Sequence, residues 1–220
     1  MESLIFQVAT LQHMVYSGEK VAGLLFFVAA TQFVLGIIIS EASYPSYSVS
    51  ANYISDLGIG PSAVIFNSSA FLLGLLLFIG TYFLRQASVF KTVSVLLFLM
   101  AVGAMSVGIF TKNFRTAHGA VATMAFFFGG LSAISSFRLL KKPLSLMSIV
   151  LGAMTLGALA LFSMGMITSG SLTSDIAYDS SFYLGLGPGG IEHLIVYPLG
   201  MWLAGFSWHL ITRREMPTEK

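Results

Sequence analysis

The sequence predicts an all-α membrane protein: a six-helix transmembrane bundle with both termini in the cytoplasm (N-in/C-in) and an amphipathic N-terminal segment. Three observations predict this fold. Of the 220 residues, 56% are hydrophobic and only 9% are charged, whereas a soluble domain carries about 25% charged residues. Six stretches almost free of Asp, Glu, Lys and Arg are long enough to cross roughly 30 Å of hydrocarbon. Finally, the basic residues gather on one side of the resulting topology.

Residues 1–20 precede the first long apolar run and are expected to form a separate segment. Leu4, Val8, Leu11 and Val15 recur at helical spacing, so a short amphipathic helix is predicted over residues 3–16. It is too short to span a bilayer and is expected to lie at the membrane surface. No basic region precedes an apolar run here, so no cleavable signal is predicted.

The transmembrane domain is predicted over residues 21–211, followed by a cytoplasmic tail over 212–220. Helices are the expected spanning element, because they satisfy their own backbone hydrogen bonds in lipid. Glycines such as Gly103, Gly108, Gly152, Gly157 and Gly165 are expected where two helices pack closely. The predicted spans are Val21–Ser40, Ser62–Leu84, Thr92–Phe110, His118–Phe137, Pro143–Ile167 and Ile191–Ile211.

The orientation follows from the eleven Lys and Arg residues. If the N-terminus is cytoplasmic, only Lys112 and Arg115 fall on the outer side. This agrees with the positive-inside rule, by which most Lys and Arg residues lie in the cytoplasmic loops. The chain is therefore expected to be a multi-pass protein of the cell membrane, with loops 41–61, 111–117 and 169–189 outside. Five of the nine acidic residues fall on that same outer side, namely Glu41, Asp56, Asp175, Asp179 and Glu192.

The loop 41–61 carries two polar residues four positions apart, Asn52 and Asp56. A short helix from about Ser50 to Leu57 would place both on one face, and Gly58 would end it. Two interpretations stay open. The segment could fold into the outer mouth of the bundle and point Asp56 inward, or it could be a solvated loop in which Asp56 or Ser55 caps the next turn.

Lys112, Arg115 and His118 surround the start of the fourth predicted span. Arg115 and His118 are three residues apart and share a helix face, where backbone N–H groups favour an anion. This indicates a site for phosphate or carboxylate. The alternative is that both cations contact lipid headgroups at the interface and His118 is only a polar helix start.

The last predicted span begins with Glu192 and His193 directly after a glycine-rich run, which is expected to be a flexible turn. Ionisable residues at this depth normally face a polar cavity or a partner. Tyr197 lies on the same helix face as His193. Asn67, inside the second span, is interpreted as a helix–helix hydrogen bond or as a wall of the outer cavity.

The candidate site follows from these residues. The candidate acid–base groups are Asp56, His118, Glu192 and His193, and the candidate substrate-binding residues are Lys112, Arg115, Asn52, Asn67 and Tyr197. The chain has no cysteine, which excludes thiolate metal sites and cysteine nucleophiles, and its net charge of +2 gives no reason to expect nucleic acid as a partner.

Several of these residues also carry a resemblance. The SDLG run at Ser55–Gly58, Asn67, His118 at a helix start, and Glu192-His193 followed by Tyr197-Pro198 resemble a family of archaeal and bacterial membrane proteins, domain-of-unknown-function family 998. The resemblance implies a polytopic protein with six or seven helices and brings no settled reaction.

More loosely, the chain is similar to alkaline ceramidases, seven-helix membrane hydrolases that hold zinc with three histidines. This resemblance implies zinc as a candidate cofactor. Only His118 and His193 are available as outer histidines, so Asp56 or another carboxylate would have to be the third ligand. Haem held by His118 and His193 is a weaker candidate.

Two classes of function remain. The first is a membrane-embedded enzyme, such as a hydrolase, acting on a lipid or lipid-linked substrate at the outer leaflet. The second is a non-catalytic accessory subunit or binding protein of a membrane complex. In either case membrane lipids are expected partners, together with a membrane-protein partner or a second copy of the chain.

Overall fold

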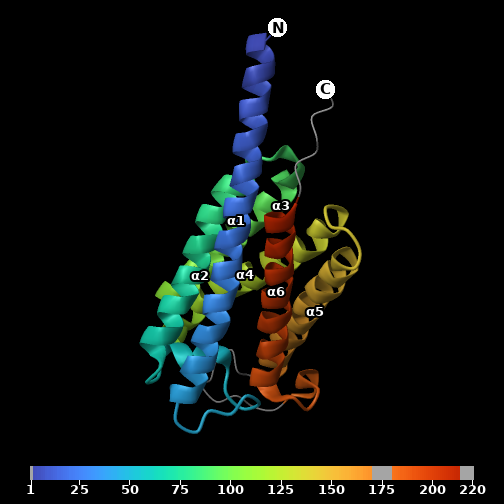
Figure 1. Ribbon diagram of the computed structural model, residues 1–220. Helices are drawn as coiled ribbons and strands as arrows, with labels where there is room; N and C mark the ends of the chain where they lie inside the picture. The colour runs from blue at the N-terminus through green and yellow to red at the C-terminus, as the bar shows by residue number, and fades with distance from the viewer. Residues whose placement is uncertain (1, 170–179, 214–220) are drawn as a thin grey trace.

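The computed structural model describes the backbone of residues 2–169 and 180–213, and the side chains of these ranges from residue 18 onward. Within them the chain is helical and contains no strand, as predicted (Figure 1). The six long helices are α1 (Glu2–Ser43), α2 (Ala63–Leu84), α3 (Lys91–Ile109), α4 (Arg115–Ser135), α5 (Leu144–Thr168) and α6 (Gly187–Thr212).

All six long helices contain a stretch apolar and long enough to cross a membrane, which confirms the predicted spans. The boundaries of α2 to α5 agree with the prediction to within a few residues, whereas α1 and α6 both start earlier than predicted. Helix α6 starts at Gly187, four residues before the predicted Ile191, and Pro188 lies in its first turn. Proline suits that position because the first N–H groups of a helix have no intrahelical acceptor. The glycine-rich run is therefore largely a helix start and not the flexible turn expected from sequence.

The N-terminal residues differ from the prediction in one respect. Residues 3–16 belong to the continuous helix α1 and do not form a separate helix. No proline separates them from the first span, and a helix that has already formed continues at little cost. Figure 1 shows this part of α1, in dark blue, projecting past the ends of the other helices.

The six helices form a closed ring. Each helix packs on the next one in the chain, and α1 packs on α6. The even number of crossings brings the N- and C-terminal ends to the same end of the bundle, as N-in/C-in topology requires (Figure 1). We call the opposite end, with residues 44–62 and 180–186, the outer end. Asp175, Asp179 and tail residues 214–220 lie outside the described residues.

The main core lies inside this ring and is built from apolar side chains of α1, α2, α3, α4 and α6. At its inner end the rings of Trp202 and Phe206 stack with centroids 5.5 Å apart. Next to them, Arg213 donates to both carboxylate oxygens of Glu19 at 3.0 and 3.1 Å, which fastens α6 to α1. Glu19 is almost fully buried, so this ion pair satisfies a charge that would otherwise be costly.

Glycines let neighbouring helices approach closely. A Cβ atom on Gly103 would lie 2.7–2.9 Å from backbone atoms of Ala125 and Val121, so α3 and α4 touch at this point. Gly108 and Gly152 are similarly crowded by a neighbouring helix, as predicted, whereas Gly165 is crowded by the ring of Tyr183, which precedes α6. Gly157 is the exception, because a Cβ there would meet nothing within 4 Å. It faces outward from α5 and is not a packing residue.

We therefore expect Gly103→Ala to destabilise the bundle by about 1–3 kcal/mol, because the added methyl group would push two helix backbones apart. Gly157→Ala is the matched control and should leave stability unchanged or slightly increased. Thermal unfolding of both variants in one detergent measures the difference. Equal melting temperatures for the two variants would contradict the close approach of α3 and α4.

Candidate functional site

The polar residues of the outer end are organised by the segment that connects α1 to α2. This segment folds over the mouth of the helix ring, as the first interpretation of loop 41–61 expected. Asp56 lines neither of the two cavities at this end, however, and its carboxylate caps a turn, as the second interpretation expected. It contains a short 3-10 helix, η1 (Ile54–Gly58), whose Ile54 and Leu57 are buried. The helix begins later than predicted and excludes Asn52, whose Oδ1 instead accepts a hydrogen bond from the N–H of Ser48 at 3.0 Å.

The glycine-rich start of α6 receives this segment. The N–H of Gly189 donates to the carbonyl of Ser50 at 3.1 Å, and the Ser50 hydroxyl donates to the carbonyl of Leu186 at 2.8 Å. A side chain on Gly189 would collide with the carbonyl oxygens of Asn52 and Val49. Gly187 adopts φ of +73°, which favours glycine. These glycines are required because two backbones meet here.

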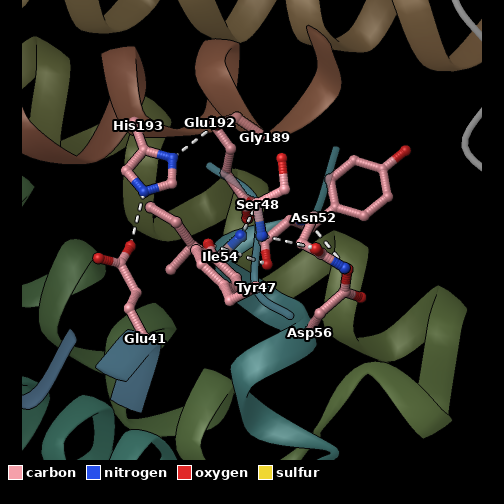
Figure 2. A network of polar contacts seen from close by, with 10 residues as sticks. Glu41, Tyr47, Ser48, Asn52, Ile54, Asp56, Gly189, Glu192 and His193 are labelled. Atoms are coloured by element: carbon pink, nitrogen blue, oxygen red, sulfur yellow. Dashed lines mark hydrogen bonds and ion pairs between the residues drawn. The ribbon is translucent and has the colours of Figure 1, made fainter. Parts of the chain in front are cut away.

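His193 joins α6 to the end of α1 (Figure 2). Its Nδ1 lies 2.7 Å from the carbonyl oxygen of Gly189, and its Nε2 lies 2.8 Å from Oε1 of Glu41. Both ring nitrogens therefore face acceptors, and an imidazolium paired with the Glu41 carboxylate satisfies both. The imidazole also contacts the ring of Tyr197 edge-on, with centroids 5.3 Å apart.

Glu192, the preceding residue, points to the other side of α6 and joins it to η1. Its Oε2 accepts a hydrogen bond from the N–H of Ile54 at 2.6 Å, and the side chain is 6% exposed. Nearby, burial and the carboxylates of Glu41, Glu192 and Asp56 raise the pKa of the Tyr47 hydroxyl. That hydroxyl therefore stays protonated at neutral pH.

Asp56 is held within the same segment and by the loop before α4. Its Oδ2 accepts from the N–H of Tyr53 at 2.9 Å, and its Oδ1 forms an ion pair with Lys112. The Lys112 ammonium also lies over the Tyr53 ring, 4.1 Å from its centroid. Lys112 is thereby held at the edge of the outer end, next to the start of α4.

His118 lies on the first turns of α4 and has a defined tautomer. Its Nδ1 is 2.7 Å from the carbonyl oxygen of Phe110, and a carbonyl can only accept. The proton therefore resides on Nδ1, and Nε2 is the nitrogen that can take up a proton when the ring is neutral.

Two cavities lie beneath η1 and share part of their lining. The first, which we call the side cavity, has a volume of about 420 Å³ and lies between α4 and α5, with Lys112 and Arg115 on its wall. The second, the axial cavity, has a volume of about 70 Å³ and runs inside the helix ring. Both cavities are lined by the same five residues, Ser55, His118, Ala122, Phe126 and Glu192. We call the three polar members, Ser55, His118 and Glu192, the polar wall.

The structure thus brings some predicted site residues together and separates others. His118, Glu192, Lys112 and Arg115 line the side cavity. Asp56 and His193 do not line this cavity. Asp56 forms an ion pair with Lys112, and His193 pairs with Glu41. Three other predicted residues have structural contacts: Asn52 bonds Ser48, Asn67 donates to the carbonyl of Gly58 at 2.9 Å, and Tyr197 packs on His193.

Ser55 is the residue that sequence reasoning missed. It was considered only as a capping residue, yet it lines both cavities. The one signal for it was its position directly before Asp56 in the SDLG run.

Comparison with known proteins agrees with the resemblance. Residues 27–209 match a family described as protein of unknown function (DUF998). The chain belongs to the DUF998 family. No curated protein and no solved structure matched it. The family description adds no activity, so the chemistry of this DUF998 protein has to be argued from its own residues.

The outer histidines do not fit the zinc site that the looser resemblance implied. His118, His193 and Asp56 each contact a different partner, namely Phe110, Glu41 with Gly189, and Lys112 with Tyr53. Among the residues with described side chains, no group of three His, Cys, Asp or Glu is placed to hold a metal ion. His193 also uses both ring nitrogens within the protein, so the same argument disfavours haem ligation by His118 and His193.

The Glu41–His193 pair is expected to stabilise the DUF998 protein through direct coupling. Glu41→Ala and His193→Ala should each cost about 1–3 kcal/mol, because each leaves the other group without its partner near the membrane boundary. The double variant should cost less than the sum, with a coupling of about 0.5–3 kcal/mol. A double-mutant cycle from chemical unfolding measures this coupling, and strictly additive losses would show that the two side chains act independently.

Proposed function

We propose that this DUF998 protein is a membrane-embedded hydrolase that acts on a lipid or lipid-linked substrate with an anionic head, at the outer end of the bundle. The observation that supports it best is the polar wall, which lines two cavities. A proton-accepting imidazole and a carboxylate belong to this wall. Basic side chains line the side cavity, and apolar side chains line most of the axial cavity.

The side cavity suits the substrate head. Lys112 and Arg115 lie on its wall close to the start of α4, where the backbone N–H groups of the helix also favour an anion. Thr116 and Thr123 add hydroxyl groups to the same cavity. A phosphate or carboxylate held there would have its neighbouring ester bond directed toward the polar wall.

The polar wall could supply general acid–base catalysis. In this mechanism a water molecule attacks the carbonyl carbon or phosphorus of the bound ester, and Nε2 of His118 takes one of its protons. The ester bond breaks, and the protonated imidazole returns that proton to the departing alkoxide oxygen. The products are an acid and an alcohol.

Glu192 could position that water. Ile54 uses one of its carboxylate oxygens, and a carboxylate can accept further hydrogen bonds. The apolar surroundings would strengthen these interactions, because they are screened less than in water.

The experiment uses purified protein in phosphatidylcholine vesicles with and without phosphatidylglycerol, and mass spectrometry to detect released acid and alcohol. We expect hydrolysis that increases with the anionic lipid. His118→Ala and Glu192→Gln should each lower it by about 10²–10⁴-fold, the usual contribution of acid–base groups. His209→Ala is the matched control, since His209 lies near the inner end of α6, away from both cavities.

Arg115→Ala should mainly raise KM for the anionic lipid, because it removes a binding charge and no reacting group. Circular dichroism and gel filtration must show that all variants remain folded. If wild-type protein consumes neither lipid, the hydrolase proposal is abandoned. If it binds phosphatidylglycerol but never turns it over, the binding-protein alternative is correct.

A further inference from the structure

The axial cavity is the part of the molecule that the proposed function leaves unexplained. It is surrounded by α1, α2, α3, α4 and α6 and roofed by Ile54 and Ser55 of η1. Below the polar wall every residue that lines it is apolar. A cavity of this kind does not hold water, because water would lose its hydrogen bonds there, but it can hold an apolar guest.

The lining of the cavity is spread along α6. It reaches from Glu192 to Leu203 on α6. Leu203 is eleven residues after Glu192, which corresponds to about 16 Å along the helix at a rise of 1.5 Å per residue. The cavity volume of about 70 Å³ gives room for about five water-sized groups. A volume of this size suits one slender chain better than two chains side by side.

The depth also matches a membrane lipid. The hydrocarbon core of a bilayer is about 30 Å thick, so the chains of one leaflet extend about 15 Å. The cavity starts at the level of the polar wall, near the outer end, and stops at a floor formed by Ala30, Leu73, Met100 and Leu203. These residues come from four helices and are all nearly inaccessible to solvent.

We propose that the axial cavity is the binding site for a single hydrocarbon chain of the substrate, and that its floor residues set the longest chain accepted. This inference rests on the proposed function for the position of the head, which would lie in the side cavity beside Lys112 and Arg115. The polar wall lines both cavities, so the bond between head and chain would face His118 and Glu192.

One wall residue allows the site to be blocked without disturbing the fold. Gly200 lines the cavity about two turns below Glu192, and a Cβ atom added there would meet only a methyl group of Val34, at 3.9 Å. Gly200→Leu therefore has space at its first atom and extends into the cavity. Gly157→Leu is the matched control: it is the same substitution, at a glycine of α5 that lines neither cavity and has no neighbour within 4 Å.

The test is photo-crosslinking with a monoacyl phosphatidylglycerol that carries a diazirine at the end of its chain, added to purified protein in phosphatidylcholine vesicles. We expect peptide mapping to find the label on Leu73, Met100 and Leu203. A second probe, with the diazirine next to the head, should label the polar wall. Each buried methylene strengthens binding about fourfold, so blocking a few of them with Gly200→Leu should lower the floor label by on the order of tenfold or more. Gly157→Leu should label as wild type does.

A second variant tests the length limit. Met100→Ala opens the floor and should increase labelling by a probe with a longer chain relative to one with a shorter chain. The inference is overturned if the terminal diazirine labels only lipid-facing residues, or if Gly200→Leu and Gly157→Leu give equal floor labelling. Floor labelling without hydrolysis supports the chain site and rejects the hydrolase, whereas hydrolysis without floor labelling supports the hydrolase and overturns the chain site.

Discussion

The interior of a bilayer offers no hydrogen-bond partner, so each polar group that a helix carries into it has to find its partner within the protein. Glu192 is the residue on which this constraint acts most strongly at the outer end. Its carboxylate is buried, and it is satisfied by the N–H of Ile54, 138 residues earlier in the chain. That bond requires the segment between α1 and α2 to fold into the mouth of the bundle. Gly187 and Gly189 provide the close backbone approach that it needs.

This arrangement links the fold to the site. The segment that partners Glu192 also supplies Ile54 and Ser55 to the roof of the axial cavity and Tyr53 to the wall of the side cavity. Asp56 from the same segment holds Lys112 beside the start of α4. The segment that satisfies the buried carboxylate of Glu192 therefore also shapes the two cavities. It positions the basic side chain of Lys112 next to them.

Ionisable residues at a membrane boundary have more than one use, and this protein shows several. At the inner end, Glu19 and Arg213 join the first helix to the last, away from both cavities. At the outer end, Glu41 and His193 make an equivalent connection between α1 and α6. His118 and Glu192 are different, because they line both cavities. The chemical type of a residue does not distinguish a structural ion pair from a residue that lines a cavity. The surroundings of the residue make that distinction.

The sequence by itself determined the six spans and the even number of crossings. These properties depend on the hydropathy and charge of residues close together in the chain, which add locally. Only the tertiary structure decided which polar side chains share a cavity. His193 and Glu192 are adjacent in sequence, yet one meets Glu41 and the other meets Ile54. Those contacts join positions 152 and 138 residues apart and depend on how each helix is rotated in the ring, which no local pattern of residues records.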